Sequence, residues 1–340
     1  MEQSRIRELE VLAARARLLA VDMVHTANSG HIGGSLSAMD LLTVLYFHTM
    51  RVDPAHPHDP DRDRFVLSKG HCTPALYPIL SLRGFFPQEE LKLFRSIEGH
   101  LSGHAEMRHV KGVDMSTGSL GQGVSAAAGM ALAAKYQGKD CRIYTLLGDG
   151  EIEEGQPWEA FMFAHQYKLD NLCVIIDNNN LQIDGKITDV MSPYPIPEKL
   201  RAFGFQVREI DGHDFEQMES AFDEARATKG VPFAIIMTTI KGKANQRGEI
   251  RRYFNCTGKS HKKLCTGPKV SIYAEDLETL VYDCIAEKLA DLKETGRHTR
   301  KADHGEVNAL KLKIKSIERL EQQLMDTMLT GGCNEDLLAL

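Results

Sequence analysis

The sequence predicts an α/β fold, with a mostly parallel sheet and helices on both faces. Two short apolar segments, Arg142–Leu147 and Leu172–Asp177, have the length and composition of buried strands. A segment of helical spacing, from about Glu153 to Tyr167, separates them. Such a strand–helix–strand unit places its two strands parallel and makes a right-handed crossover. The 340 residues, 42% of them hydrophobic, are enough for one large or two medium domains.

The N-terminal elements follow from spacing and from breaker residues. Residues 6–25 have the pattern of an amphipathic helix, and Ser37–Met50 returns to helical spacing. Between them, Asn28–Leu36 is expected to be a loop because of its glycines. Asp53–Arg64 is rich in Pro, Asp and His and is expected to be a surface loop. The apolar triplet Phe65–Leu67 is then a short strand.

Later elements continue the alternation of strands and helices. Glu98–Gly123 is rich in Gly, Ser and His and has little periodicity, which is typical of a functional loop. The Ala-rich segment Val124–Tyr136 is predicted to be helical. Phe205–Ile210 and Phe233–Thr239 are further strands, with a helix over Phe215–Ala227 between them. This order is typical of an α/β domain.

The composition changes after Lys243, where we place a domain boundary. Lys241–Lys269 holds nine Lys or Arg residues against one acidic residue. Helices are predicted near Ala274–Lys293 and over Val307–Leu329. The sequence therefore predicts a main domain over residues 1–243. A basic linker and a helical C-terminal extension follow over residues 244–340.

Charge, hydropathy and cysteine usage exclude several classes of function. The formal charge of −6 argues against general nucleic-acid binding, which depends on a basic excess. Apolar runs such as Leu172–Ile176 are far shorter than the roughly 20 residues of a membrane span, and no signal peptide is visible. Seven scattered cysteines predict free thiols and a cytoplasmic location. Cys256, His261 and Cys265 lack a convincing fourth ligand for zinc.

Polar motifs follow two neighbouring predicted strands. Gly148–Gly150 (Gly-Asp-Gly) follows the first strand, and Asn178–Asn180 follows the second. Ligands of open parallel sheets bind beyond the carboxyl ends of the strands, so these motifs should share one edge. Asp149, Asn179 and the Leu181 carbonyl would suit Mg²⁺, which prefers oxygen ligands and phosphate oxygens. Taken singly, each motif is also compatible with a plain turn.

The wider pattern resembles the thiamine-diphosphate signature. Gly148–Ala160 is similar to the transketolase form of it, and the resemblance covers roughly residues 10–243. In deoxyxylulose-phosphate synthases and 2-oxo-acid dehydrogenase E1 proteins, the residues after Gly-Asp-Gly differ. The resemblance implies the thiamine-diphosphate-binding fold and two cofactors, thiamine diphosphate and Mg²⁺. It places Asp149, Asn179 and the Leu181 carbonyl on Mg²⁺, and Gly150 and Asn179 at the diphosphate.

Three histidine loops match the same family. Ser29–Gly34 resembles its Ser-Gly-His-Pro-Gly loop, with Ile32 in place of proline, and Leu67–His71 resembles its Ser-x-Gly-His turn. Ser102–Glu106 resembles its Gly-His-Pro-Glu turn, with Ala105 in place of proline. The resemblance implies that His71 contacts the diphosphate and that His31 and His104 face the reacting carbons and the sugar hydroxyls. Imidazole can donate or accept a proton near neutral pH. The remaining candidates match nothing and are expected to be structural: His25, His100 and His109.

Two further motifs complete the implied site. Ser116–Gly123 resembles the family's Thr-Gly-Pro-Leu-Gly-Gln-Gly, with Ser119 in place of proline. The resemblance implies that backbone groups of Gly118, Ser119 and Leu120 contact the aminopyrimidine. Glu154 resembles a glutamate that connects the two active sites of the dimer. Its alternative is a solvated carboxylate in the first turn of a helix, favoured by the helix dipole.

The resemblance also implies a partner subunit. A complete transketolase has a pyrimidine-binding domain that supplies the glutamate activating the cofactor, and no such domain follows residue 243. The chain therefore resembles the N-terminal subunit of a split transketolase. Such a subunit would act with a C-terminal pyrimidine-domain subunit, with homodimer contacts in an α2β2 heterotetramer. It would transfer a two-carbon dihydroxyethyl unit from a ketose phosphate to an aldose phosphate.

The tail departs from the family. The usual pattern continues toward a Trp-His-Gly segment, whose histidine lies at the cofactor, but Ala244–His261 does not match it. Whether His261 replaces that histidine stays open, as do the donor and acceptor sugars. The tail helices could dock the partner, extend a homodimer, bind a regulator or cover the chain's own surface. Other thiamine-diphosphate enzymes remain alternatives, either deoxyxylulose-phosphate synthase-like or specialised-sugar ketol transferases. A non-catalytic regulatory relic is a further alternative.

Overall fold

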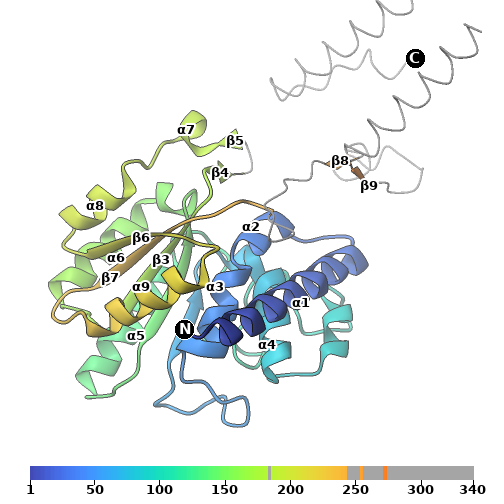
Figure 1. Cartoon of the computed structure of the whole chain (residues 1–340), viewed down its shortest axis with the longest axis horizontal. Helices are drawn as coiled ribbons and strands as arrows, with labels where there is room; N and C mark the ends of the chain where they lie inside the picture. Colours follow the sequence, from blue (N-terminus) through green and yellow to red (C-terminus); the bar gives the residue numbers. More distant parts are fainter. Residues whose placement is uncertain (183–184, 243–252, 256–270, 274–340) are drawn as a thin grey trace, which may run out of the picture. The chain divides into compact units, whose positions relative to one another are not determined.

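The computed structural model describes residues 1–182, 185–242, 253–255 and 271–273 (Figure 1). The chain divides into two compact units, Met1–Arg251 and Arg252–Leu340, and each is described by itself. In the second unit, β8 (Tyr253–Asn255) and β9 (Ser271–Tyr273) form an antiparallel pair. The domain boundary predicted near 243, the two predicted tail helices and the side chains of Cys256, His261 and Cys265 lie outside the described residues.

A parallel sheet of five strands forms the centre of the first unit. Its strand order is β1-β2-β3-β7-β6, and every neighbouring pair is parallel. The strands are β1 (Arg64–Leu67), β2 (Ile143–Gly148), β3 (Leu172–Asn178), β6 (Gln206–Asp211) and β7 (Phe233–Thr238). In the register of β2 and β3, Gly148 lies opposite Asp177. The two predicted polar motifs therefore follow their strands at the same edge of the sheet.

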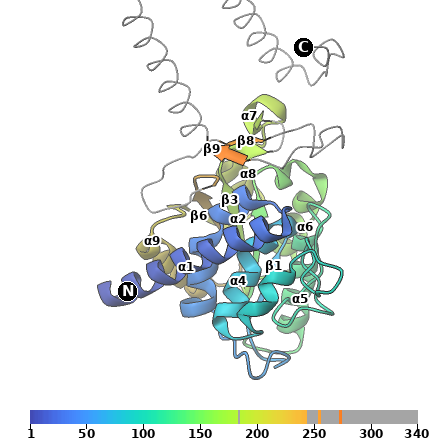
Figure 2. The ribbon, with the colours of Figure 1, turned by 90° about the vertical axis from the view of Figure 1, so that its right-hand side faces the viewer.

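Helices cover both faces of the sheet, which confirms the predicted fold class (Figures 1 and 2). Successive strand residues point to opposite faces, so Cys173 and Ile175 join one core while Val174 and Ile176 join the other. The first core includes α1 (Gln3–Ala27), α3 (Met39–Val44), α4 (Thr73–Arg83) and α9 (Phe215–Ala227). The second includes α5 (Gly123–Tyr136), α6 (Gly155–Gln166) and α8 (Ile196–Ala202).

The predicted loop over Asn28–Leu36 is wrong in its second half. Residues Ile32–Ser37 form the short helix α2, and the predicted helix over Ser37–Met50 is divided into α3 and a π-helical turn, Leu45–Thr49. Hydroxyl groups support this helix locally, because Ser35 Oγ donates to the His31 carbonyl at 2.7 Å and Ser37 Oγ to the Gly34 carbonyl at 2.9 Å. Glycines at the start of this buried helix give it the composition of a loop.

Other predicted elements agree with the structure to within a few residues, but several were missed. The predicted surface loop Asp53–Arg64 ends in two buried residues, Arg62 and Asp63. Besides α4 and α8, the missed elements include a hairpin, β4 (Leu181–Gln182) with β5 (Gly185–Lys186), and the short helix α7 (Ile187–Val190). The missed 3-10 turns are Gly70–Cys72, Gln88–Leu93 and Glu151–Glu153.

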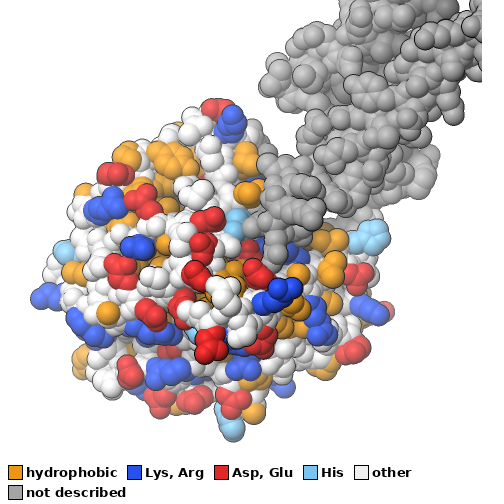
Figure 3. Space-filling model, in the orientation of Figure 1, with side chains coloured by type: hydrophobic (Ala, Val, Ile, Leu, Met, Phe, Trp, Pro, Cys, Tyr) orange, Lys and Arg blue, Asp and Glu red, His pale blue; other side chains and the backbone are white. Residues whose placement is uncertain are grey.

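The surface of the described part carries both signs of charge. On the face shown in Figure 3, acidic and basic side chains are interspersed, as expected from a weak net charge of −6. In the described residues, no helix combines the length and the apolar character that crossing a membrane requires.

The contact between the rings of Phe222 and Tyr144 lies in the first core, and a substitution of Phe222 tests its contribution to stability. Phe222 on α9 is 1% exposed, and its ring meets Tyr144 of β2 edge-on, with centroids 5.7 Å apart. We expect Phe222→Ala to lower the free energy of unfolding by about 3–5 kcal/mol, because it leaves a cavity. The control, Tyr136→Ala, removes an aromatic ring that is 92% exposed and should change the free energy of unfolding by less than about 0.5 kcal/mol. Urea unfolding measures both, and equal effects would contradict the assigned core.

Candidate functional site

A cleft of about 350 Å³ lies at the carboxyl ends of the central strands. It gathers loops that follow β1, β2, β3 and β7, together with the start of α2. Nine of the predicted site residues line it: His31, His71, His104, Gly118, Leu120, Asp149, Gly150, Asn179 and Leu181. Ser119 and Glu154 are exposed and are not among the lining residues. Most of the site residues predicted from the sequence therefore lie in one cleft.

Asp149 is a buried carboxylate at the base of this cleft. Its side chain accepts hydrogen bonds from the Gly150 amide at 3.0 Å and from the Asn180 amide at 2.5 Å. Burial, and then the nearby charge of Asp177, raises the pKa of Asp149 to about 6. A carboxylate held in this environment gains strongly from a nearby cation.

The two other predicted metal ligands follow β3. The Asn179 Oδ1 accepts from the Leu181 amide at 3.2 Å, and the Leu181 carbonyl accepts from Lys241 Nζ at 2.9 Å. Leu181 is fixed by the β4–β5 hairpin, in which it pairs with Lys186. Each oxygen has two lone pairs, so both retain capacity for a further partner.

This donor set suits Mg²⁺. It offers one carboxylate, one amide oxygen and one backbone carbonyl, all hard oxygen ligands. The Asn180 Oδ1, beside them in sequence, is buried without a hydrogen-bond partner. Among the described residues, no three His, Cys, Asp or Glu side chains gather as a metal cluster, so the nitrogen and sulfur set that zinc prefers is not seen there.

The three predicted histidines lie together in the lining of the cleft. The ring of His31 is 5.2 Å from that of His71 and 6.3 Å from that of His104, between centroids. Burial, and then Lys69, lowers the pKa of His71 to about 3. Burial, followed by the charge of Arg95, also lowers the pKa of His31. Both rings are therefore neutral near pH 7 and can accept or donate one hydrogen bond at each nitrogen.

Glycines allow these loops to approach one another. A Cβ on Gly70 would lie 2.7 Å from the Gly118 amide nitrogen, and one on Gly118 would lie 3.2 Å from the His104 ring. A side chain at Gly70 would require the neighbouring backbone to shift, and one at Gly118 would require the His104 ring to move by a few tenths of an ångström. The turn that carries His71 thus packs directly on the loop predicted to contact the aminopyrimidine.

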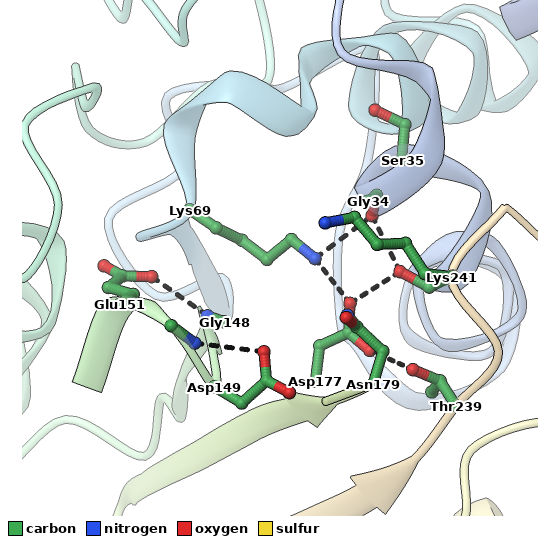
Figure 4. Close-up of polar contacts among 12 residues, drawn as sticks. Gly34, Ser35, Lys69, Gly148, Asp149, Glu151, Asp177, Asn179, Thr239 and Lys241 are labelled. Atoms are coloured by element: carbon green, nitrogen blue, oxygen red, sulfur yellow. Dashed lines mark hydrogen bonds and ion pairs between the residues drawn. The ribbon is translucent and has the colours of Figure 1, made fainter. Parts of the chain in front are cut away.

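Three charged residues of the site were missed as candidates: Lys69, Glu151 and Lys241 (Figure 4). Lys69 is 2% exposed and pairs with Asp177 at 2.5 Å beneath the cleft. Glu151 is 2% exposed and accepts from the amides of Gly121 and Gly148, each at 3.0 Å, and from Ser68 Oγ at 2.5 Å. All three stand inside or beside motifs quoted from the sequence, but they contact residues far away in the sequence, and such contacts produce no periodic signal.

The helix predicted from about Glu153 begins two residues later, at Gly155. Residues Glu151–Glu153 form a 3-10 turn, and α6 starts at Gly155 with the exposed Glu154 at its N-cap. Because of the intervening turn, the first amides of α6 do not follow Gly148–Gly150 directly. In that turn, the amides of Gly148 and Gly150 donate to the carboxylates of Glu151 and Asp149, each at 3.0 Å.

A wider depression of about 880 Å³ adjoins the histidines and shares His104 with the cleft. Its lining includes Arg95, His100, Glu106 and Ser116. Arg95 donates to Ser29 Oγ at 2.6 Å, next to the His31 loop. The histidine side of the cleft is thus open to a polar molecule of sugar size.

The fold and the site define an α/β domain with a polar cleft at the carboxyl ends of its central strands. Residues 9–253 match the family described as transketolase, thiamine diphosphate binding domain. The chain belongs to this family, and it is a transketolase-type transferase chain with a thiamine-diphosphate-binding domain.

Separate subunits are among its relatives. The chain is 46% identical to the 6-deoxy-6-sulfo-D-fructose transketolase subunit of Clostridium sp. (strain MSTE9), over 69% of this chain and 86% of that protein. It is 43% identical to one subunit of the apulose-4-phosphate transketolase of Phocaeicola vulgatus, over 70% of this chain and 84% of that protein.

The structure of transketolase from Campylobacter jejuni superposes with a TM-score of 0.66 at 38% identity. That match covers 69% of this chain but only 38% of that one. The chain thus spans most of the related separate subunits and well under half of that transketolase structure.

Glu151 joins the loops that contain Gly121 and Gly148, and a substitution of Glu151 tests this role. Glu151→Gln would place an NH2 group against an amide N–H, so we expect the free energy of unfolding to fall by about 1–3 kcal/mol. The control, Glu159→Gln, changes an exposed carboxylate of α6 and should leave the free energy of unfolding unchanged. Chemical denaturation compares the two variants, and equal stability would show that Glu151 does not join the loops.

Proposed function

We propose that the chain is the cofactor-diphosphate subunit of a two-subunit transketolase dependent on thiamine diphosphate and Mg²⁺. One observation carries the proposal: the predicted oxygen ligands and three histidines line one cleft. The donor reaction would remove a two-carbon dihydroxyethyl unit from a ketose phosphate, and an aldose phosphate would accept it.

Each side of the cleft would have its own task. Asp149, Asn179 and the Leu181 carbonyl would hold Mg²⁺, and Gly150, Asn179 and His71 would bind the diphosphate. Backbone groups of Gly118, Ser119 and Leu120 would bind the aminopyrimidine. The bound cofactor supplies the nucleophilic carbon that carries the two-carbon unit.

His31 and His104 would orient the sugar. Their ring centroids lie 6.3 Å apart, both residues line the cleft, and both are exposed. An imidazole there can donate a hydrogen bond to one hydroxyl and accept one from another. Burial of the cofactor below them would leave the sugar in contact with the rim.

A pyrimidine-domain subunit would complete the site. The relative in Phocaeicola vulgatus is named as one subunit of its transketolase, and this chain covers 84% of it, which supports a separate partner. We propose an α2β2 assembly in which the exposed Glu154 connects the active sites by hydrogen bonds. Three described cysteines, Cys72, Cys141 and Cys173, are free and buried, which supports a cytoplasmic location.

A specialised sugar is the second candidate for the substrate. Two relatives, at 46% and 43% identity, are named for a sulfo-sugar and for apulose 4-phosphate. Product analysis with pentose phosphates, with those two sugars and with pyruvate would separate ketol transfer among sugars from a deoxyxylulose-phosphate synthase-like reaction.

Removing the Asp149 carboxylate tests the metal site. We expect Asp149→Ala to weaken Mg²⁺-dependent binding of thiamine diphosphate by at least about 100-fold, because the one charged ligand of the proposed set is lost. Trp158, the only tryptophan of the chain, donates to the Ile152 carbonyl at 3.0 Å beside the Gly148–Gly150 turn. We therefore expect its fluorescence to change when the cofactor binds. Asp223→Ala, at an exposed site on α9, is the control, and unchanged binding by Asp149→Ala would refute the assignment.

Reconstitution tests the need for a partner. We expect the chain alone, with both cofactors, to show no ketol transfer, because the residue that activates the cofactor lies on another domain. Adding a pyrimidine-domain transketolase subunit should restore turnover, measured by the aldose product. Robust turnover without the partner would refute the split-subunit proposal. Absence of activity with every pyrimidine-domain subunit tried would favour a non-catalytic role.

A further inference from the structure

A buried histidine outside the cleft binds the chain segment that carries Lys241. The backbone amide of Ile240 donates to His213 Nε2 at 3.0 Å. The other ring nitrogen, Nδ1, lies 2.8 Å from Asp40 Oδ2. Because Nε2 accepts a hydrogen bond, the ring proton must be on Nδ1, which donates to Asp40.

Asp40 is itself rigidly held. Arg17 binds both of its oxygens, at 2.8 and 2.7 Å, and the side chains of Asp40, Arg17 and His213 are 5%, 7% and 7% exposed. Although burial opposes ionisation, hydrogen bonds from His213 and Arg17 lower the pKa of Asp40. An ionised, immobile acceptor fixes both the orientation and the tautomer of the His213 ring.

In the sequence, Ile240 lies between Thr239 and Lys241, of which only Lys241 lines the cleft. Thr239 donates to Asp177 beneath the cleft, and Lys241 reaches the Leu181 carbonyl above it. One residue further on, the Gly242 amide donates to the Gly33 carbonyl at 3.0 Å. Hydrogen bonds thus hold the backbone over 239–242 at several residues. His213 accepts the hydrogen bond at Ile240, directly before Lys241.

We propose that His213 is a positioning residue of the cofactor site, which places the Lys241 ammonium at the Mg²⁺–diphosphate edge by accepting the Ile240 hydrogen bond. The inference rests on the proposed function for the identity of the ligand. His213 does not line the cleft, so it acts only through the backbone of Ile240 and Lys241. The attraction between an ammonium and a diphosphate falls with distance, so a displaced Lys241 binds the anion less well.

Two substitutions separate the two hydrogen bonds of His213. A Gln side chain is long enough to put its oxygen near the Nε2 position, and so retains the acceptor for Ile240. An Asn side chain reaches only the Nδ1 position, and so retains the contact to Asp40 alone. With Mg²⁺ saturating, we expect His213→Asn to weaken thiamine diphosphate binding about tenfold and His213→Gln by no more than about threefold. Trp158 fluorescence gives both affinities.

A double-mutant cycle with Lys241→Met decides whether His213 acts through Lys241. In the Lys241→Met background, we expect the Asn and Gln variants to bind equally, because the group they position is gone. The same loss for His213→Asn in both backgrounds would overturn the inference. An unchanged affinity in Lys241→Met alone would overturn it too. Binding of thiamine, which has no phosphate, should differ little among the variants.

The unaltered chain provides a test that does not depend on folding of the variants. Nitrogen chemical shifts of His213 should show the Nδ1–H tautomer, with Nε2 unprotonated, and an Nε2–H tautomer would overturn the inference. If the unaltered chain fails to bind thiamine diphosphate with Mg²⁺, the proposed function falls together with the inference. If it binds but the cycle is additive, only the role of His213 is refuted.

Discussion

At the carboxyl end of β3, the fully buried carboxylate of Asp177 joins the segments that build the cleft. It accepts from Lys69 Nζ and from Ser37 Oγ at 2.5 and 2.6 Å, and also from Thr239 Oγ1. These donors come from α2, from the turn after β1 and from the residue after β7. Figure 4 shows Lys69 and Thr239 beside Asp177. Burial alone would favour the neutral forms of both charged groups, but the pair holds the pKa of Asp177 low and that of Lys69 high. A buried charge without its partner is strongly destabilising, so this contact requires all these segments to stay together.

The same ion pair explains the electrostatics of the cleft. Lys69 lies near His71 and, after burial, is the largest cause of the low pKa of about 3 for that histidine. Asp149, with its pKa of about 6, feels the neighbouring Asp177 and is relieved only partly by Lys69. One part of the cleft therefore favours a cation, and the part near Lys69 and Lys241 favours an anion. A metal ion with a diphosphate satisfies both requirements, whereas a free metal ion or a free phosphate satisfies one.

The sequence predicted the parts of this arrangement that follow from strand order and from local motifs. Parallel β2 and β3 had to bring Asp149 and Asn179 to one edge, and the structure confirms that edge. The gathering of the three histidines came from family resemblance, because their loops are far apart in the sequence and no periodicity relates them. Lys69 and Asp177 are 108 positions apart, and a contact of that span has no local signal. Glycines at the start of α2 have the composition of a loop, but the structure places them in a short helix in which two serine hydroxyls bond to the backbone.

The distribution of burial in the cleft separates a fixed base from an open rim. Asp149, Glu151 and Lys69 are each 2% exposed, whereas Leu120 and Leu181 are 37% and 39% exposed at the edge of the same cleft. His31 and His104 also lie on this exposed side. A diphosphate needs a rigid polar base, and the chain provides one from its own side chains. A reacting thiazolium and sugar need exclusion of water, which an exposed rim does not give. A second protein surface over this rim would supply it, so the shape of the site supports the proposed partner independently of the relatives that are separate subunits.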